Sequence, residues 1–126
     1  MKTIIHSSKA PDPIGPYSQA VRSGNTVYIS GQIPIDQKSG EFKMEDIESE
    51  THQVMKNIGY ILEAANLDYH NILKCSIFIK NMSDFSKIND VYEKYFKSEP
   101  PARETVEVSR LPKNVNVEIS CIAYIE

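Results

Sequence analysis

The chain has no excess of basic residues and no long apolar run. Its 14 lysines and arginines stand against 17 aspartates and glutamates, which leaves a net charge of -3 at pH 7. Because a phosphate backbone is bound mainly through clustered positive charge, this balance argues against nucleic acid as a partner. No apolar segment approaches the roughly 20 residues that a membrane helix needs. The start, Met1 to His6, is too short and too polar for a signal peptide, so we expect a cytoplasmic protein with no membrane partner.

Cysteine and histidine are also scarce. The two cysteines, Cys75 and Cys121, each lie in a predicted strand among aliphatic residues, where a reduced thiol packs like a small hydrophobic group. The three histidines are scattered, with no pair at i, i+4 and no cysteine spacing typical of zinc. We therefore expect core packing for the thiols, surface or boundary positions for the histidines, and no built-in metal.

The composition is typical of one globular domain. The 126 residues are 25% charged and 40% hydrophobic, which argues against disorder. A chain of this size can bury roughly two thirds of its unfolded surface in a single core. We treat residues 1–126 as one domain.

Residue periodicity predicts two helices among six strands. Apolar residues recur at helical spacing from about 46 to 65, with Asp46 placed as N-cap, and from 84 to 96, with Ser83 placed as N-cap. Alternating segments and their turns predict strands at 3–6, 18–22, 26–30, 72–80, 103–108 and 115–124. The order is three strands, a helix, a strand, a helix and two strands. It predicts an α+β fold with both helices on one face of a mixed sheet.

The last predicted strand has two different faces. One face is uniformly apolar and consists of Val115, Val117, Ile119, Cys121 and Ala123. The other mixes polar and apolar side chains and consists of Asn116, Glu118, Ser120, Ile122 and Tyr124. The mixed face is too apolar for open water, so we expect another subunit to cover it, with the functional residues near that contact.

One arginine and one glutamate lie on the last two predicted strands. Pro100 and Pro101 end the preceding segment, so the strand begins at about Arg103. If a hairpin turns between these strands, residues whose numbers sum to about 223 lie opposite each other, which brings Glu118 near Thr105 and close to Arg103. Two interpretations remain open from spacing: a shared pocket, or an ordinary cross-strand ion pair worth about 0 to 1 kcal/mol if exposed. Spacing alone favours the ion pair.

Four separate segments together resemble one family. They are Gly15-Pro16-Tyr17-Ser18-Gln19-Ala20, Ser30-Gly31-Gln32-Ile33-Pro34, the segment from Phe78 to Phe85, and Pro101-Ala102-Arg103 continued to Val117-Glu118-Ile119. In this order they resemble the RidA/YjgF family over nearly the whole chain, which is far less prone to chance than a lone motif. The resemblance implies a chorismate-mutase-like α+β fold and a homotrimer with a cleft at each subunit interface. It also implies 2-iminobutanoate/2-iminopropanoate deaminase activity on small 2-imino acids, without a cofactor.

The resemblance also assigns roles to five residues. Arg103 corresponds to the family arginine that grips the substrate carboxylate, which a planar guanidinium does through two parallel hydrogen bonds. Glu118 corresponds to the glutamate that holds and polarises the attacking water. Tyr17 contributes a hydroxyl at the cleft wall, and Gly31 and Thr105 contribute backbone groups.

The sequence departs from the family pattern after the arginine. Many deaminase-active members have a small residue and then a cysteine there, whereas this chain has Glu104 and Thr105. Activity that rests on Arg103, Glu118 and backbone groups should tolerate threonine, but thiol-dependent reactivity at that position should be lost. The alternative is a ligand-binding regulatory or chaperone-like module without turnover. A ribonuclease is disfavoured, because the chain is acidic and lacks a basic aromatic strip.

Overall fold

The computed structural model describes residues 1–126 and confirms the predicted order of elements. The elements are β1 (Lys2–Ile5), β2 (Ala20–Ser23), β3 (Thr26–Gln32), α1 (Ile47–Ala64), β4 (Ile72–Ile79), α2 (Phe85–Tyr92), β5 (Ala102–Glu107) and β6 (Val117–Tyr124). Single 3-10 turns lie at Tyr69–Asn71, Met82–Asp84, Glu93–Tyr95 and Pro112–Asn114.

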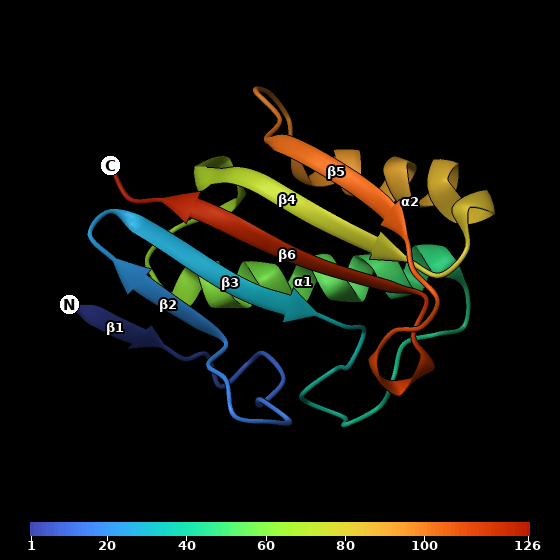
Figure 1. Ribbon diagram of the computed structural model, residues 1–126, viewed down its shortest axis with the longest axis horizontal. Coiled ribbons are helices and arrows are strands. Elements are labelled where there is room, and N and C mark those ends of the chain that lie inside the picture. Colours follow the sequence, from blue (N-terminus) through green and yellow to red (C-terminus); the bar gives the residue numbers. More distant parts are fainter.

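The six strands form one mixed sheet in the order β1-β2-β3-β6-β4-β5. All neighbours are antiparallel except β4 and β5, which are parallel. Both helices lie behind this sheet in Figure 1 and leave its other face uncovered. We call the uncovered side the open face; its residues include Tyr28, Phe78, Val106, Ser120, Ile122 and Tyr124. The predicted α+β class, with two helices on one face, is confirmed.

The predicted hairpin between the last two strands is wrong. β5 pairs with β4, and β6 inserts between β3 and β4, so no ladder joins β5 to β6. The connection from β4 to β5 runs through α2, and a strand, helix, strand unit of this kind gives a parallel pair. β6 is apolar enough for the centre of the sheet, whereas the mostly exposed β5 suits the edge.

The core fills the space between the helices and the covered face of the sheet. All five residues assigned to the apolar face of the last strand are buried, as predicted from their alternation. The facing stripe of α1 includes Val54, Ile58, Ile61 and Leu62, each 0% exposed. Truncating a buried isoleucine or leucine to alanine typically costs about 2 to 5 kcal/mol, so this layer holds the sheet and helices in register.

The helix caps are predicted correctly for one helix only. Asp46 caps α1 as expected, since its carboxylate accepts a 2.7 Å hydrogen bond from Ser49 N. Ser83 does not cap α2, which was expected to start at 84. Instead Asn81 Oδ1 accepts from Ser83 N at 3.0 Å and caps a 3-10 turn, and the α-helix begins at Phe85.

β4 contains a local irregularity that the alternation does not reveal. The register with β6 shifts between Ile72 and Lys74, which buries Ile72 and leaves Leu73 53% exposed. Strict alternation would place Leu73 on the same face as Cys75, Ile77 and Ile79. The rest of β4 alternates as expected, with Cys75, Ile77 and Ile79 buried.

No helix of the structure is both long and apolar enough to span a bilayer.

Candidate functional site

Three of the five predicted site residues share one cavity at the open face. This Glu118 pocket, of about 360 Å³, is lined by Ile14, Tyr17, Ser30, Gly31, Ile33, Pro112 and Glu118. They come from the loop before β2, the end of β3, the segment before β6 and β6 itself. Segments far apart in sequence therefore build the pocket, and the sequence motifs that lie in them meet in space.

Gly31 is required by the position of the Glu118 side chain. The register between β3 and β6 shifts between Ile29 and Gln32, and this shift brings the backbone of Gly31 against the Glu118 carboxylate. A Cβ at Gly31 would overlap with the carboxylate, so any larger residue would displace it. Glycine thus allows backbone and carboxylate to face the same small space.

Glu118 carries its charge in a partly apolar setting. The residue is half-buried on β6 and forms none of the four salt bridges of the chain. Desolvation by burial raises the pKa of its carboxyl group above the usual value. The carboxylate is therefore a stronger base than an exposed glutamate and is free to accept a hydrogen bond from a ligand or a water molecule.

Tyr17 is held at the pocket wall by an ordered loop. The buried side chain of Gln19, only 2% exposed, accepts a 2.6 Å bond from Ser7 N and donates to the carbonyls of Ser7, Ala10 and Pro11. Tyr17 Oη accepts a 3.3 Å hydrogen bond from Ile14 N, and the ring remains 48% exposed. The loop is proline-rich, yet its conformation is fixed from inside by one amide.

A second cavity surrounds Arg103 at the other edge of the sheet. This Arg103 pocket, of about 440 Å³, is lined by Asn89, Tyr92, Glu93, Phe96, Pro100, Pro101 and Arg103. Arg103 Nη1 donates a 2.7 Å hydrogen bond to Asn89 Oδ1. The guanidinium carbon lies 5.6 Å from the centre of the Phe85 ring and 5.1 Å from that of Tyr92. Arg103 is thus fixed by α2, and its fork is oriented before any ligand arrives.

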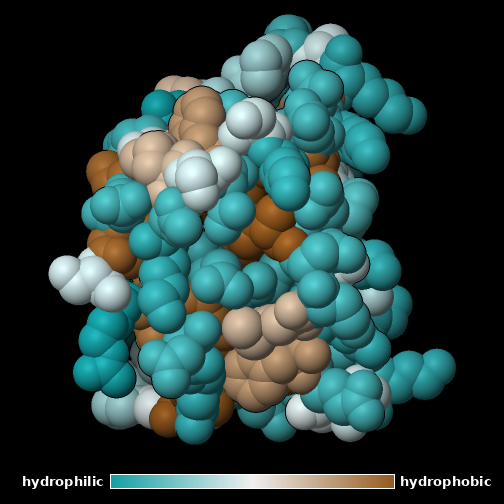
Figure 2. Space-filling model, turned by 90° about the vertical axis from the view of Figure 1, so that its right-hand side faces the viewer, coloured by the Kyte–Doolittle hydropathy of each residue, from teal (hydrophilic) through white to brown (hydrophobic).

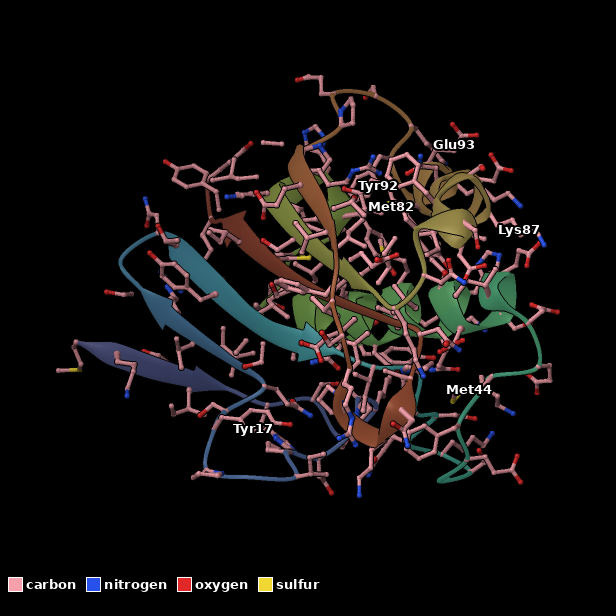
Figure 3. The ribbon with its side chains drawn as sticks, turned by 45° about the vertical axis from the view of Figure 1, so that its right-hand side comes forward. Tyr17, Met44, Met82, Lys87, Tyr92 and Glu93 are labelled. Carbon is pink, nitrogen blue, oxygen red and sulfur yellow. The ribbon has the colours of Figure 1, made fainter.

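One copy of the chain does not bring Arg103 and Glu118 together. Arg103 is in register with Cys75, whose side chain points to the helices, whereas Glu118 is in register with Phe78 on the open face. The two charged groups therefore lie on opposite faces of the sheet. The two pockets are also apart along the sheet, since Tyr17 of the Glu118 pocket and Tyr92 of the Arg103 pocket lie toward opposite edges in Figure 3. The expected proximity within a chain is wrong, because it rested on the hairpin.

The side chains of Thr105 and Glu104 point to opposite faces of the sheet, as those of successive residues in a strand do. Thr105, in register with Ile77, faces the helices, and its hydroxyl is buried without a hydrogen-bond partner. Glu104 lies on the open face, where its carboxylate accepts from Ser76 Oγ and pairs with Lys74 Nζ at 3.1 Å. Glu104 therefore points to the opposite face from Arg103.

Two residues that hold parts of the site in place were missed from the sequence. Glu50 on α1 is 1% exposed and accepts hydrogen bonds from Asn116 N and Nδ2 at 2.7 and 2.8 Å, which anchors the segment before β6. Its spacing from the buried Val54 could have placed it on the core face of the helix. Asn89, the partner of Arg103, is four residues from Phe85 and three from Tyr92, so helical spacing puts all three side chains together.

The chain offers no cluster for a metal ion. No group of three or more histidine, cysteine, aspartate or glutamate side chains is close enough to bind one. The chemistry available at the two pockets is that of a carboxylate, a phenol hydroxyl, backbone groups and a guanidinium.

Fold and pockets define a single-sheet α+β protein with one cavity around Glu118 and another around Arg103, and comparisons identify its family. The family model for Endoribonuclease L-PSP matches residues 7–125. A RutC family protein of Pyrococcus horikoshii is 52% identical over 126 residues, with 100% of each chain covered. The human 2-iminobutanoate/2-iminopropanoate deaminase is 42% identical over 123 residues, which cover 98% of this chain and 90% of the human one. The chain belongs to the RidA/YjgF family.

Solved structures of the family agree closely with this fold. RidA from an Antarctic Psychrobacter has a TM-score of 0.94 and 41% identity, covering 98% of this chain and 99% of its own. The Escherichia coli protein TdcF, solved with bound serine, also has a TM-score of 0.94, with 38% identity and coverage of 98% and 99%. The family resemblance drawn from the four motifs is confirmed.

Proposed function

We propose that this protein is a reactive-intermediate deaminase that hydrolyses 2-iminobutanoate and 2-iminopropanoate to 2-keto acids and ammonia. The relatives named deaminases support this activity, at 42% identity in human and 47% in Dermatophagoides farinae. The observation that carries the proposal is the half-buried, unpaired Glu118 carboxylate beside Gly31 and Tyr17. Serine bound to TdcF supports the size and charge of the ligand, since serine is a small acid with an amino group.

In the proposed reaction, each group has a separate task. Arg103 grips the substrate carboxylate through its guanidinium fork. Glu118 accepts a proton from a water molecule and directs its oxygen to the imine carbon. The Tyr17 hydroxyl and the backbone of Gly31 and Thr105 complete the hydrogen bonding. Imines of 2-keto acids also hydrolyse unaided, so orienting substrate and water is sufficient, and the proposal includes no cofactor.

The positions of the two pockets support a site shared between copies of the chain. Arg103 and Glu118 face opposite sides of the sheet, so they reach one substrate only if a second copy brings its Arg103 to this copy's Glu118. The open face, with Tyr28 48% exposed and Tyr124 and Val106 each 41% exposed, is the surface we assign to this contact. Figure 2 views the chain from the right-hand side of Figure 1, edge-on to the sheet, and shows apolar patches among hydrophilic residues on that side. We propose a homotrimer with one cleft at each interface.

The test is hydrolysis of 2-iminobutanoate released in solution by a threonine dehydratase. The intact protein should accelerate formation of 2-oxobutanoate, and Arg103→Ala should abolish the acceleration while the protein remains folded. Arg22→Ala is the matched control, because the Arg22 side chain hydrogen-bonds only to the carbonyl of Gly24. Binding of 2-oxobutanoate without any acceleration by the intact protein would instead favour a ligand-binding module.

A further inference from the structure

The two cysteines of the chain face each other inside the core. Cys75 on β4 and Cys121 on β6 are directly opposed in the antiparallel ladder, and their sulfur atoms are 3.4 Å apart. Both side chains are buried, at 0% and 4% exposure, and both are free thiols. The two residues face each other because β6 lies beside β4 in the sheet.

The ladder geometry at this pair suits a disulfide. Lys80 N donates to Asn116 O at 3.0 Å, so Lys80 and Asn116 form a hydrogen-bonded pair. Pair types alternate along an antiparallel ladder, and the register is unbroken from Lys74 to Ile79, so Cys75 and Cys121 form a non-hydrogen-bonded pair. Such pairs have Cα atoms about 4.5 Å apart, within the range of about 4.4 to 6.8 Å found for disulfides.

The surroundings of the two sulfur atoms are unequal. Cys75 lies next to Arg103 in the β4–β5 register and beside Tyr92, whose hydroxyl is buried without a hydrogen-bond partner. The hydrogen bond from Cys121, together with the charge of Arg103, lowers the pKa of the Cys75 thiol. The same pairing and its burial raise the pKa of Cys121. Cys75 is therefore the attacking sulfur and Cys121 the resolving one.

Cys75 lies behind the wall of the Arg103 pocket. Arg103 and Tyr92, which flank this cysteine, both line the Arg103 pocket of about 440 Å³. The pocket is large enough for a molecule the size of hydrogen peroxide, and Cys75, which is 0% exposed, is separated from it by the side chains of these two residues. Cys75 and Cys121 are the two cysteines of the chain, so the buried pair holds all its thiols.

We propose that Cys75 and Cys121 form a redox-modification site that hydrogen peroxide converts to an intrachain disulfide. The Cys75 thiolate attacks one peroxide oxygen, the O–O bond breaks, and the released hydroxide takes up the thiol proton to leave as water. Cys75 then carries a sulfenic acid. Cys121 sulfur attacks Cys75 sulfur, the S–O bond breaks, and the hydroxyl leaves as water with the Cys121 proton. Two thiols lose two hydrogen atoms and one peroxide becomes two waters. This chemistry is independent of imine hydrolysis.

The test is oxidation of the folded protein with hydrogen peroxide, followed by denaturation and thiol titration. We expect both thiols to disappear, a peptide linking Cys75 to Cys121 to appear in a nonreducing digest, and dithiothreitol to restore both thiols. In Cys121→Ser, which keeps a hydrogen-bond donor beside Cys75 but cannot form a disulfide, the reaction should stop at sulfenic acid on Cys75, which dimedone traps. In Cys75→Ala, Cys121 should remain a thiol under the same treatment.

Three results would overturn the proposal. They are two intact thiols after peroxide, a linkage between chains in place of the internal one, and oxidation of Cys75 to sulfinic acid in the wild type without a disulfide. The readouts on the unmodified protein need no variant, so a variant that fails to fold does not affect the conclusion. Guanidinium-unfolded protein is the control, because it exposes the same thiols without their pairing.

Discussion

The Glu118 pocket and the Arg103 pocket differ in how their charged groups are held. Arg103 is fixed by a hydrogen bond to Asn89 and by the rings of Phe85 and Tyr92. Glu118 forms no salt bridge and lies half-buried against the backbone of Gly31. The comparison shows a cation whose orientation is set in advance and a base left free for a ligand. This division is suited to gripping an anion with one group and activating water with the other.

The largest expected effect is on turnover at the Glu118 pocket. Glu118→Gln keeps the shape of the side chain but removes the base, so turnover should fall by about 10² to 10⁴ fold. Binding of 2-oxobutanoate should change little, since the proposed function assigns its carboxylate to Arg103. Steady-state kinetics and calorimetry measure the two quantities, and Glu63→Gln is the control because Glu63 only pairs with Lys9 on the surface. Equal losses of binding and turnover would contradict the division of tasks.

The next effect concerns the geometry of the guanidinium group in the Arg103 pocket. Arg103→Lys keeps the positive charge but cannot make two parallel hydrogen bonds and loses the bond to Asn89. Losing about 1.5 to 3 kcal/mol of charged hydrogen bonding should lower kcat/KM about 10 to 100 fold. A variant as active as the wild type would show that charge alone is sufficient and that the held orientation has no role.

A smaller effect is expected one contact away from the substrate. Asn89→Ala frees the guanidinium without removing it, so kcat/KM should fall about tenfold, mainly through a higher KM. Asp90→Ala, an exposed neighbour on the same helix, should have no effect. The measurement is how the loss divides between KM and kcat. A loss confined to kcat would mean that Asn89 affects the chemical step assigned to Glu118 and not the binding assigned to Arg103.

The smallest effect is a shift in pH dependence. Burial raises the pKa of Glu118, and the proposed base must be ionised, so kcat/KM should fall as pH decreases through that raised pKa. The descending limb should therefore lie above the usual glutamate pKa of about 4.3. Glu118→Gln should lack this limb. A limb at the usual value in the wild type would mean that Glu118 is more solvated in the working protein than in the single chain.

Much of the fold was predictable because local patterns determine it. Alternation along β6 identified its buried face, and the position of Asp46 identified the start of α1. The strand pairing was predicted wrongly, because the hairpin argument paired strands that are neighbours in sequence. Strand order also depends on which strands are apolar enough for the centre of the sheet. The strand, helix, strand order around α2 was the available signal for β4 and β5 to run parallel.

The candidate site was predictable in its residues but not in its geometry. The four motifs pointed to Tyr17, Gly31, Arg103, Thr105 and Glu118, and three of these line one pocket. Helical spacing could have added Asn89. That Arg103 and Glu118 lie on opposite faces could not be read from the motifs, because the motifs do not show which strands pair and in what register.

The most direct test of a shared site is to mix two inactive variants. Arg103→Ala and Glu118→Gln proteins would be unfolded together in equal amounts, refolded, and assayed on 2-iminobutanoate, with each variant refolded alone as control. If each site takes its arginine and its glutamate from different copies, about a quarter of the interfaces have both, so about a quarter of wild-type activity should return. Mixed assemblies that form, as mass spectrometry can verify, but stay as inactive as the separate variants would contradict the shared site.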